Sequence, residues 1–137
     1  YNALRFRGPE YLYKEVPPHY LDDASALVLA KLRLDGFVSL DADAAGILTT
    51  KLFLPKGGCL IVNVDASDGE VVAELLDESK QPIVGFIAAE AIPIHGDLLR
   101  GAVAWQNHST LPQDQTVHLR LYMKRCKLYS FHVESQA

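Results

Sequence analysis

Residues 116–133 read TVHLRLYMKRCKLYSFHV, and this stretch decides the fold class. Every second residue from 117 to 123 is apolar and is expected in the core: Val117, Leu119, Leu121 and Met123. The residues between them are expected on the outer surface: His118, Arg120, Tyr122 and Lys124. A period of two is typical of a half-buried strand. The stretch therefore predicts two long strands, 116–124 and 126–133.

The rest of the chain also consists of short strand-like runs separated by turn residues. Strands are predicted at 37–42, 46–54, 59–66, 70–77, 83–88 and 100–106. Ser67-Asp68-Gly69 predicts a hairpin turn between 59–66 and 70–77, and 89–99 is expected to be a loop. The run ASALVLAKLRL (24–34) fits a strand or a three-turn helix, and the surrounding β pattern favours a strand. Turn signals every eight to twelve residues predict an all-β fold, a two-sheet antiparallel sandwich of the jelly-roll or lectin-like kind.

Length and composition indicate one globular domain with a preceding segment. The chain has 137 residues, of which 49% are hydrophobic and 22% charged. Residues 1–30 contain Pro9, Pro17 and Pro18 and are expected to be a linker or the tail of a preceding domain. Residues 31–137 are expected to form the sandwich. The chain starts with Tyr1 rather than Met, which suggests a piece of a longer polypeptide.

The net charge and the lengths of the apolar runs limit the classes of partner that we expect. The net charge is −4, which argues against a nucleic-acid partner because phosphate binding needs a basic face. No apolar run approaches the roughly 18 residues of a membrane span, so no membrane partner is expected. The compartment is left open, with an extracellular location favoured.

Two cysteines leave two interpretations open. Both cysteines, Cys59 and Cys126, lie in strand-like runs, and they are either two buried free thiols or the two halves of one disulfide.

No metal site or cofactor is predicted, because there is no CxxC and no His spacing that suits a metal. The acidic stretches LDADAAG (40–46) and DASDG (65–69) could hold a structural Ca²⁺, with solvated turn residues as the default interpretation.

The sequence carries no pattern typical of catalysis. There is no GxSxG, phosphate-binding loop, GxGxxG or HExxH motif. A carboxylate pair could be assembled from several acidic residues near strand ends, which are more commonly turn formers: Asp35, Asp41, Asp43, Asp65 and Glu74. The chain is therefore predicted not to be an enzyme.

Carbohydrate binding is the chemistry that the strand-borne aromatic residues suggest. An aromatic ring is flat and apolar with a polar edge, which suits the face of a pyranose. The ligand-binding candidates are Trp105, Tyr122, Asn107, His118 and Arg120. Two interpretations of Trp105 stay open, core packing or a ligand platform. Tyr122 lies on the polar face of its strand and is the better exposed candidate.

Several stretches resemble the C-terminal β-sandwich module of proteins with a fructosidase-type propeller, glycoside hydrolase family thirty-two and its relatives. The resemblance covers about 33–133 and rests on DGFVSLDA (35–42), NVDASDGE (63–70), IVGF (83–86) and LRLYMKRCKLYSF (119–131). In that family the propeller carries the catalytic carboxylates, so the resemblance implies an accessory module without a catalytic site. It transfers no functional residue.

Two functions follow from these observations. The first is a non-catalytic module that binds carbohydrate beside a glycosidase-like preceding domain of the same polypeptide. The alternative is a structural or assembly domain that mediates interdomain or homo-oligomer contacts, and a large apolar patch on one sheet would favour it.

Overall fold

The computed structural model describes residues 2–4, 25–27 and 29–135, and the chain divides into two compact units, Tyr1–Leu32 and Arg33–Ala137. The sequence placed the division between residues 30 and 31. In the first unit, strand β1 (Asn2–Leu4) pairs antiparallel with β2 (Ser25–Leu27). Residues 29–34 lie in no strand, so the predicted strand 24–34 is wrong for this part. Most of the predicted linker lies outside the described residues.

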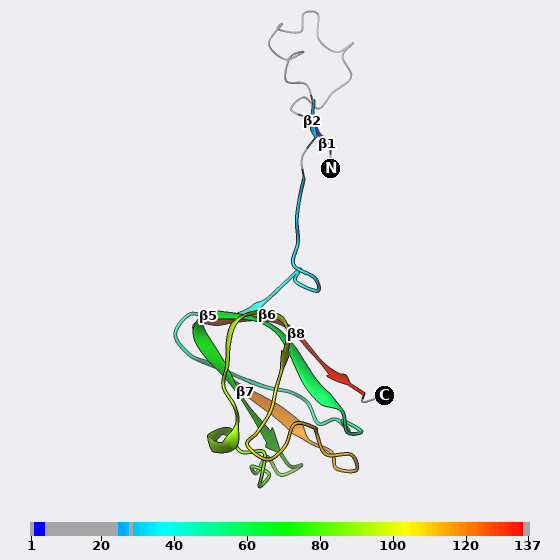
Figure 1. Cartoon of the computed structure of the whole chain (residues 1–137), viewed down its shortest axis with the longest axis vertical. Helices are drawn as coiled ribbons and strands as arrows, with labels where there is room; N and C mark the ends of the chain where they lie inside the picture. Colours follow the sequence, from blue (N-terminus) through cyan, green and yellow to red (C-terminus); the bar gives the residue numbers. More distant parts are fainter. Residues whose placement is uncertain (1, 5–24, 28, 136–137) are drawn as a thin grey trace, which may run out of the picture. The chain divides into compact units, whose positions relative to one another are not determined.

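The second unit is built on a long two-stranded ribbon (Figure 1). Its first strand is β5 (Cys59–Leu76), and β7 (His118–Lys124) and β8 (Cys126–Glu134) follow one another along it. β8 pairs antiparallel with the first half of β5, and β7 pairs antiparallel with the second half. Only Arg125 separates β7 from β8, so the two act as one strand with a bend.

The predicted hairpin turn at Ser67-Asp68-Gly69 is wrong, because β5 continues through these residues. They form the bend where the partner of β5 changes from β8 to β7. A Cβ on Gly69 would lie 1.7 Å from the carbonyl oxygen of Lys124, so only glycine allows this approach. Arg125 Nε donates to the carbonyl of Asp68 at 2.8 Å across the same bend. The Asp-Gly signal therefore marks a bend in a strand rather than a reversal of the chain.

Three further strands complete a six-stranded sheet, with the order β3-β8-β5-β7-β4 and β6 beside β5. β3 (Leu40–Ala42) pairs with β8, and β4 (Gly46–Thr49) pairs with β7. β6 (Ile94–Ala102) pairs with β5 across register shifts. Residues 43–45 join the two end strands of this order, so the antiparallel sheet is nearly closed.

Several predicted boundaries are wrong. The predicted strands 37–42 and 46–54 shorten to β3 and β4, and the predicted strand 83–88 is replaced by turns and the short 3₁₀ helix η2 (Ala88–Glu90). The predicted loop 89–99 contains the start of β6, because Gly96 adopts a positive φ of 86° that lets the strand bend and keep β5 as its partner. The predicted strand 100–106 therefore ends at Ala102.

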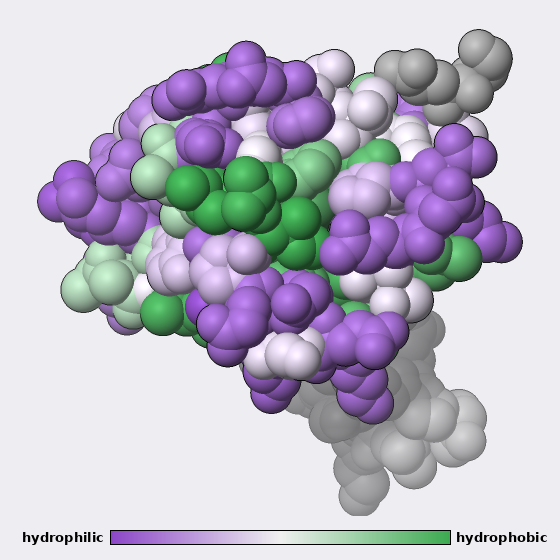
Figure 2. Space-filling view, turned by 90° about the horizontal axis from the view of Figure 1, so that it is seen from below, coloured by the Kyte–Doolittle hydropathy of each residue, from purple (hydrophilic) through white to green (hydrophobic). Residues whose placement is uncertain are grey.

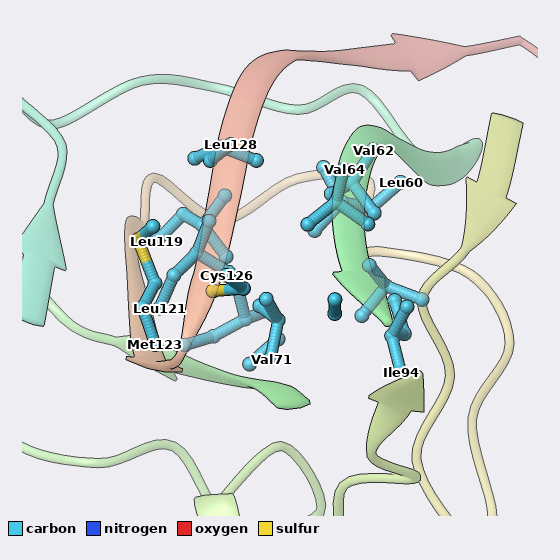
Figure 3. Close-up of a cluster of buried hydrophobic side chains, with 14 of the residues drawn as sticks. Leu60, Val62, Val64, Val71, Ile94, Leu119, Leu121, Met123, Cys126 and Leu128 are labelled. Atoms are coloured by element: carbon cyan, nitrogen blue, oxygen red, sulfur yellow. The ribbon is translucent and has the colours of Figure 1, made fainter. Parts of the chain in front are cut away.

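The core lies inside the sheet, where side chains from β5, β6, β7 and β8 meet (Figure 3). The four residues predicted to face inward from 116–124 are at most 5% exposed, which confirms the predicted alternation: Val117, Leu119, Leu121 and Met123. The expectation of an all-β fold is confirmed, since the only helix in the described residues is the 3₁₀ turn.

The disulfide interpretation does not hold, because the two cysteines lie too far apart along β8 to be joined. Cys59 pairs with Glu134 at the end of β8, whereas Cys126 is the first residue of β8. Eight residues of strand, about 26 Å, separate the two positions, far more than the roughly 7 Å between Cα atoms that a disulfide spans.

Candidate functional site

Three of the five predicted ligand-binding residues lie together on the outer face of β7. His118, Arg120 and Tyr122 occupy alternate positions and are all partly exposed. This follows from the pleat of the strand, which turns alternate side chains to the same side. His118 is fixed by a hydrogen bond from Nδ1 to the carbonyl of Thr50 at 2.8 Å.

A buried carboxylate holds the other two side chains. Glu74, on the neighbouring strand β5, is 6% exposed and pairs in register with Arg120. The Tyr122 hydroxyl donates to Glu74 Oε2 at 2.8 Å, and Arg120 Nη1 lies 3.5 Å from the same oxygen. The backbone N–H of Ala88 lies 3.4 Å from the other oxygen, Oε1. Because a buried charge is costly unless it is paired, these contacts explain how the sheet tolerates Glu74.

A shallow depression of about 430 Å³ lies beside Tyr122, and we call it the Tyr122 depression. Its lining is mostly apolar and comes from β4 with the preceding residue, β5 and β7: Ala45, Gly46, Ile47, Glu70, Val72, Tyr122, Met123 and Lys124. The charges at its border are paired with each other, since Lys124 Nζ lies 3.7 Å from Glu70 Oε1. The depression therefore offers aliphatic and aromatic surface framed by balanced charges.

Trp105 lies in the core rather than on this surface. It is 2% exposed, packs edge to face on Phe86 at 5.1 Å between ring centroids, and donates from Nε1 to the carbonyl of Ala73 at 3.1 Å. Of the two interpretations left open, the geometry fits core packing. Asn107 is exposed in the turn after Trp105 and is not on β7.

Tyr129, an aromatic residue of β8, already has a cation over its ring. The guanidinium carbon of Arg33 lies 4.6 Å from the centre of its ring. Arg33 also donates to the side chains of Asn63 and Asp97 and to the carbonyls of Val64 and Leu98. We call this set of contacts the Arg33 clamp. It ties the start of the second unit to β5, β6 and β8.

The two acidic stretches singled out in the sequence meet at one pocket of about 290 Å³. Its acidic lining residues are Asp41, Asp43, Asp65 and Asp68. A hydrogen bond from Ser39 lowers the pKa of Asp41, and hydrogen bonds from the hydroxyl and backbone of Ser67 lower the pKa of Asp65. In the described part of the chain, no group of three or more His, Cys, Asp or Glu side chains is arranged to hold a metal ion.

Glu74 contacts two of the candidate residues but was not itself predicted as a site residue, because it was grouped with acidic residues that commonly form turns. Alternation within β5 places Glu74 on the outer face with Glu70 and Val72, and this signal was present in the sequence. Its contact with Arg120 depends on the register between β5 and β7, which no local pattern gives.

No family model, curated protein or solved structure matches this chain. None of the helices among the described residues is long and apolar enough to cross a membrane.

Proposed function

We propose that the unit Arg33–Ala137 is a non-catalytic module that binds carbohydrate at the Tyr122 depression. The observation that carries the proposal is the Tyr122 ring beside Ile47 and Val72, with Glu74 and Arg120 fixed next to it. The aliphatic and aromatic lining suits the C–H face of a sugar ring, and the polar groups suit its hydroxyls. A shallow surface site of this kind fits one or two sugar units of a longer chain.

The charges point to a neutral sugar. Arg120 is paired with Glu74, and Lys124 is paired with Glu70. A uronic acid or a sulfated sugar would have to compete with a carboxylate already bound to each cation. Hydroxyl groups can share these donors and acceptors without breaking either pair.

Two arguments support a binding rather than a catalytic role. A glycosidase needs one carboxyl with a raised pKa as general acid, beside a second that stays ionised. In the acidic pocket the shifts of Asp41 and Asp65 are both downward, which suits neither a general acid nor a shared proton. The resemblance of 33–133 to the sandwich that follows a fructosidase-type propeller also favours an accessory role.

We also propose how the sheet is divided into layers and which kind of domain the module accompanies. The bent ribbon of β5 with β7 and β8 would divide the sheet into two layers of a jelly-roll-like sandwich. The module would sit beside a glycosidase-like domain of the same polypeptide, outside the cell.

A glycan-array screen followed by calorimetry tests the proposal. We expect a neutral glycan to bind wild type, and Tyr122→Ala to weaken binding about tenfold or more, a loss typical of one stacked ring. Tyr122→Phe keeps the ring and loses only the hydrogen bond to Glu74, so most of the affinity should remain. Val84→Ala, at a side chain that is 91% exposed and outside the depression, is the matched control. A blank array, or a folded Tyr122→Ala that binds as wild type does, would refute the site.

The assembly function remains the second candidate, and exposed apolar side chains favour it. Phe37, Val38 and Val84 are 82%, 79% and 91% exposed. Figure 2 shows a face on which hydrophobic residues gather at the centre within a hydrophilic border. Contiguous apolar surface of this kind is typical of contact with another protein.

A further inference from the structure

A second depression, of about 390 Å³, adjoins the Tyr122 depression, and we call it the His95 depression. Apart from Gly69, every residue that lines it is polar or charged. Glu70 and Lys124 line both depressions, so the two meet at this ion pair. The sheet therefore carries one strip of hollowed surface that is apolar at one end and polar at the other.

This strip crosses the sheet from β7 to β6. Tyr122 lies on β7 and His95 on β6, and β5 lies between these strands, because Val71 pairs with both Met123 and Ile94. Two strand spacings separate β7 from β6, which is roughly 10 Å. One pyranose ring is shorter than this span, so a carbohydrate that reaches both ends must be a chain of linked sugars.

His95 is held with one ring nitrogen directed away from the protein backbone. Its Nδ1 lies 2.8 Å from the carbonyl oxygen of Gly69. A carbonyl oxygen can only accept, so Nδ1 carries the proton of this bond, and Nε2 of the neutral ring is an acceptor. The preceding residue, Ile94, is buried, and alternation turns the exposed His95 to the outer face. His95 therefore offers an oriented acceptor to a sugar hydroxyl.

The ion pair between the two depressions can also bond hydroxyl groups. Lys124 Nζ and Glu70 Oε1 are 3.7 Å apart, and the two side chains are 54% and 36% exposed. This distance is longer than a hydrogen bond, so the pair is a charge contact. Neighbouring hydroxyls of one sugar, one donating to Glu70 and one accepting from Lys124, fit such a pair.

We propose that the module binds a chain of linked neutral sugars across the sheet, with one ring on Tyr122 and a later unit bonded to His95 Nε2. This inference rests on the proposed function and extends its site from one ring to a chain. Stacking on Tyr122 accepts the apolar face of many sugars. The acceptor on His95 requires a hydroxyl at one position, so His95 determines specificity and rejects a chain that lacks this hydroxyl.

Binding of a size ladder to the whole chain tests the proposal. The probe is the ladder from monosaccharide to hexasaccharide of the neutral glycan that gives the strongest signal on the array. Calorimetry, with NMR titration for the weakest members, should show that the longer members bind wild type about tenfold more tightly than the monosaccharide. The tightening should stop once the chain is long enough to reach His95.

Variants at the two ends of the strip should affect the ladder differently. Tyr122→Ala should weaken every member, because every member stacks on the ring. His95→Ala should weaken only the longer members, about threefold to tenfold, as the loss of one hydrogen bond does. His132→Ala is the matched control, because His132 is an exposed histidine of β8 that lines neither depression. It should bind every member as wild type does.

His95→Asn separates contact with the sugar from support of the bend. The asparagine side-chain nitrogen replaces Nδ1 and keeps the bond to Gly69, but no atom replaces Nε2. His95→Asn should therefore lose affinity for the longer members as His95→Ala does, whereas His95→Gln, which places a polar atom near Nε2, should recover part of it. Circular dichroism checks that each variant is folded. A folded His95→Asn that binds the longer members as wild type does would overturn the proposal.

The outcomes also distinguish the chain from the single ring. If all lengths bind equally and Tyr122→Ala weakens them all, the Tyr122 site stands and the chain across the sheet is refuted. A length preference that His95→Ala leaves intact would refute it as well, because the chain would then follow another path. An array without any signal would overturn both proposals.

Discussion

At the scale of single residues, Trp105 contributes to the core through both its ring and its indole N–H. Trp105→Phe keeps an aromatic contact with Phe86 but leaves the buried carbonyl of Ala73 without its donor. We expect a loss of about 1–3 kcal/mol in the free energy of unfolding, and about 3–5 kcal/mol for Trp105→Ala. Urea unfolding followed by circular dichroism measures both. A loss of stability near zero for Trp105→Ala would contradict the core position.

The second residue-scale prediction concerns pH. The hydrogen bonds from Ser67 lower the pKa of Asp65 below its ordinary 3.8. A lowered folded pKa means that the ionised form stabilises the fold at every pH above 3.8, and that this contribution disappears as the pH falls through the folded value. Ser67→Ala should therefore raise the pKa of Asp65 and reduce stability at neutral pH, with no difference from wild type once Asp65 is protonated.

Carboxyl NMR titration measures the pKa of Asp65, and urea unfolding at neutral and strongly acidic pH measures the stability difference. Ser39→Ala is the matched control, because the Ser39 hydroxyl bonds Asp41 and should shift that carboxyl alone. A stability difference that grows in acid would contradict the sign of this argument.

At the scale of the elements, the bend in β5 depends on Gly69. A methyl group at Gly69 would collide with the backbone oxygen of Lys124, which cannot move without disturbing β7. Gly69→Ala should cost at least about 2 kcal/mol. Gly96→Ala is the matched control, because its φ is +86° but no atom lies within 4 Å of the added methyl, so about 1 kcal/mol of backbone strain is expected. Chemical denaturation compares the two, and equal losses would mean that steric contact at Gly69 is unimportant.

The elements also show what a sequence can and cannot predict. A period of two placed His118, Arg120 and Tyr122 on one face of β7, because side-chain direction is a local property of a strand. The Asp-Gly hairpin was wrong because a bend and a reversal use the same residues, and only the close approach of Lys124 distinguishes them. Pairing between strands is non-local, so local sequence patterns could not predict the contact of Glu74 with Arg120.

The Arg33 clamp joins several strands, and neither composition nor local sequence pattern predicts it. Asp97 is exposed and contributes one ion pair, whereas Arg33 in addition bonds the buried Asn63 and two backbone carbonyls. Arg33→Met should therefore cost about 1–3 kcal/mol, mainly through Asn63, and Asp97→Asn less than about 1 kcal/mol. Thermal or urea unfolding of the two variants and the double variant gives the coupling energy. A larger loss from Asp97→Asn than from Arg33→Met would contradict this ranking.

At the scale of the whole molecule, the sheet is held by packing rather than by a covalent link. Cys59 and Cys126 lie at opposite ends of the β5–β8 ladder, so no disulfide can join them within one copy. A reducing agent should therefore leave the unfolding midpoint unchanged.

Burial raises the pKa of the Cys126 thiol, with the carboxylates of Asp41 and Asp65 adding to the effect, so this thiol is a poor nucleophile in the folded state. A thiol reagent should label Cys126 only as fast as the sheet opens, and denaturant should accelerate labelling in parallel with unfolding. Peptide mapping by mass spectrometry follows the label at Cys126, with the fully unfolded chain as the reference rate. Rapid labelling of Cys126 in the native protein would mean that the sheet opens locally at the β5 bend, and the bend would then be the least stable part of the fold.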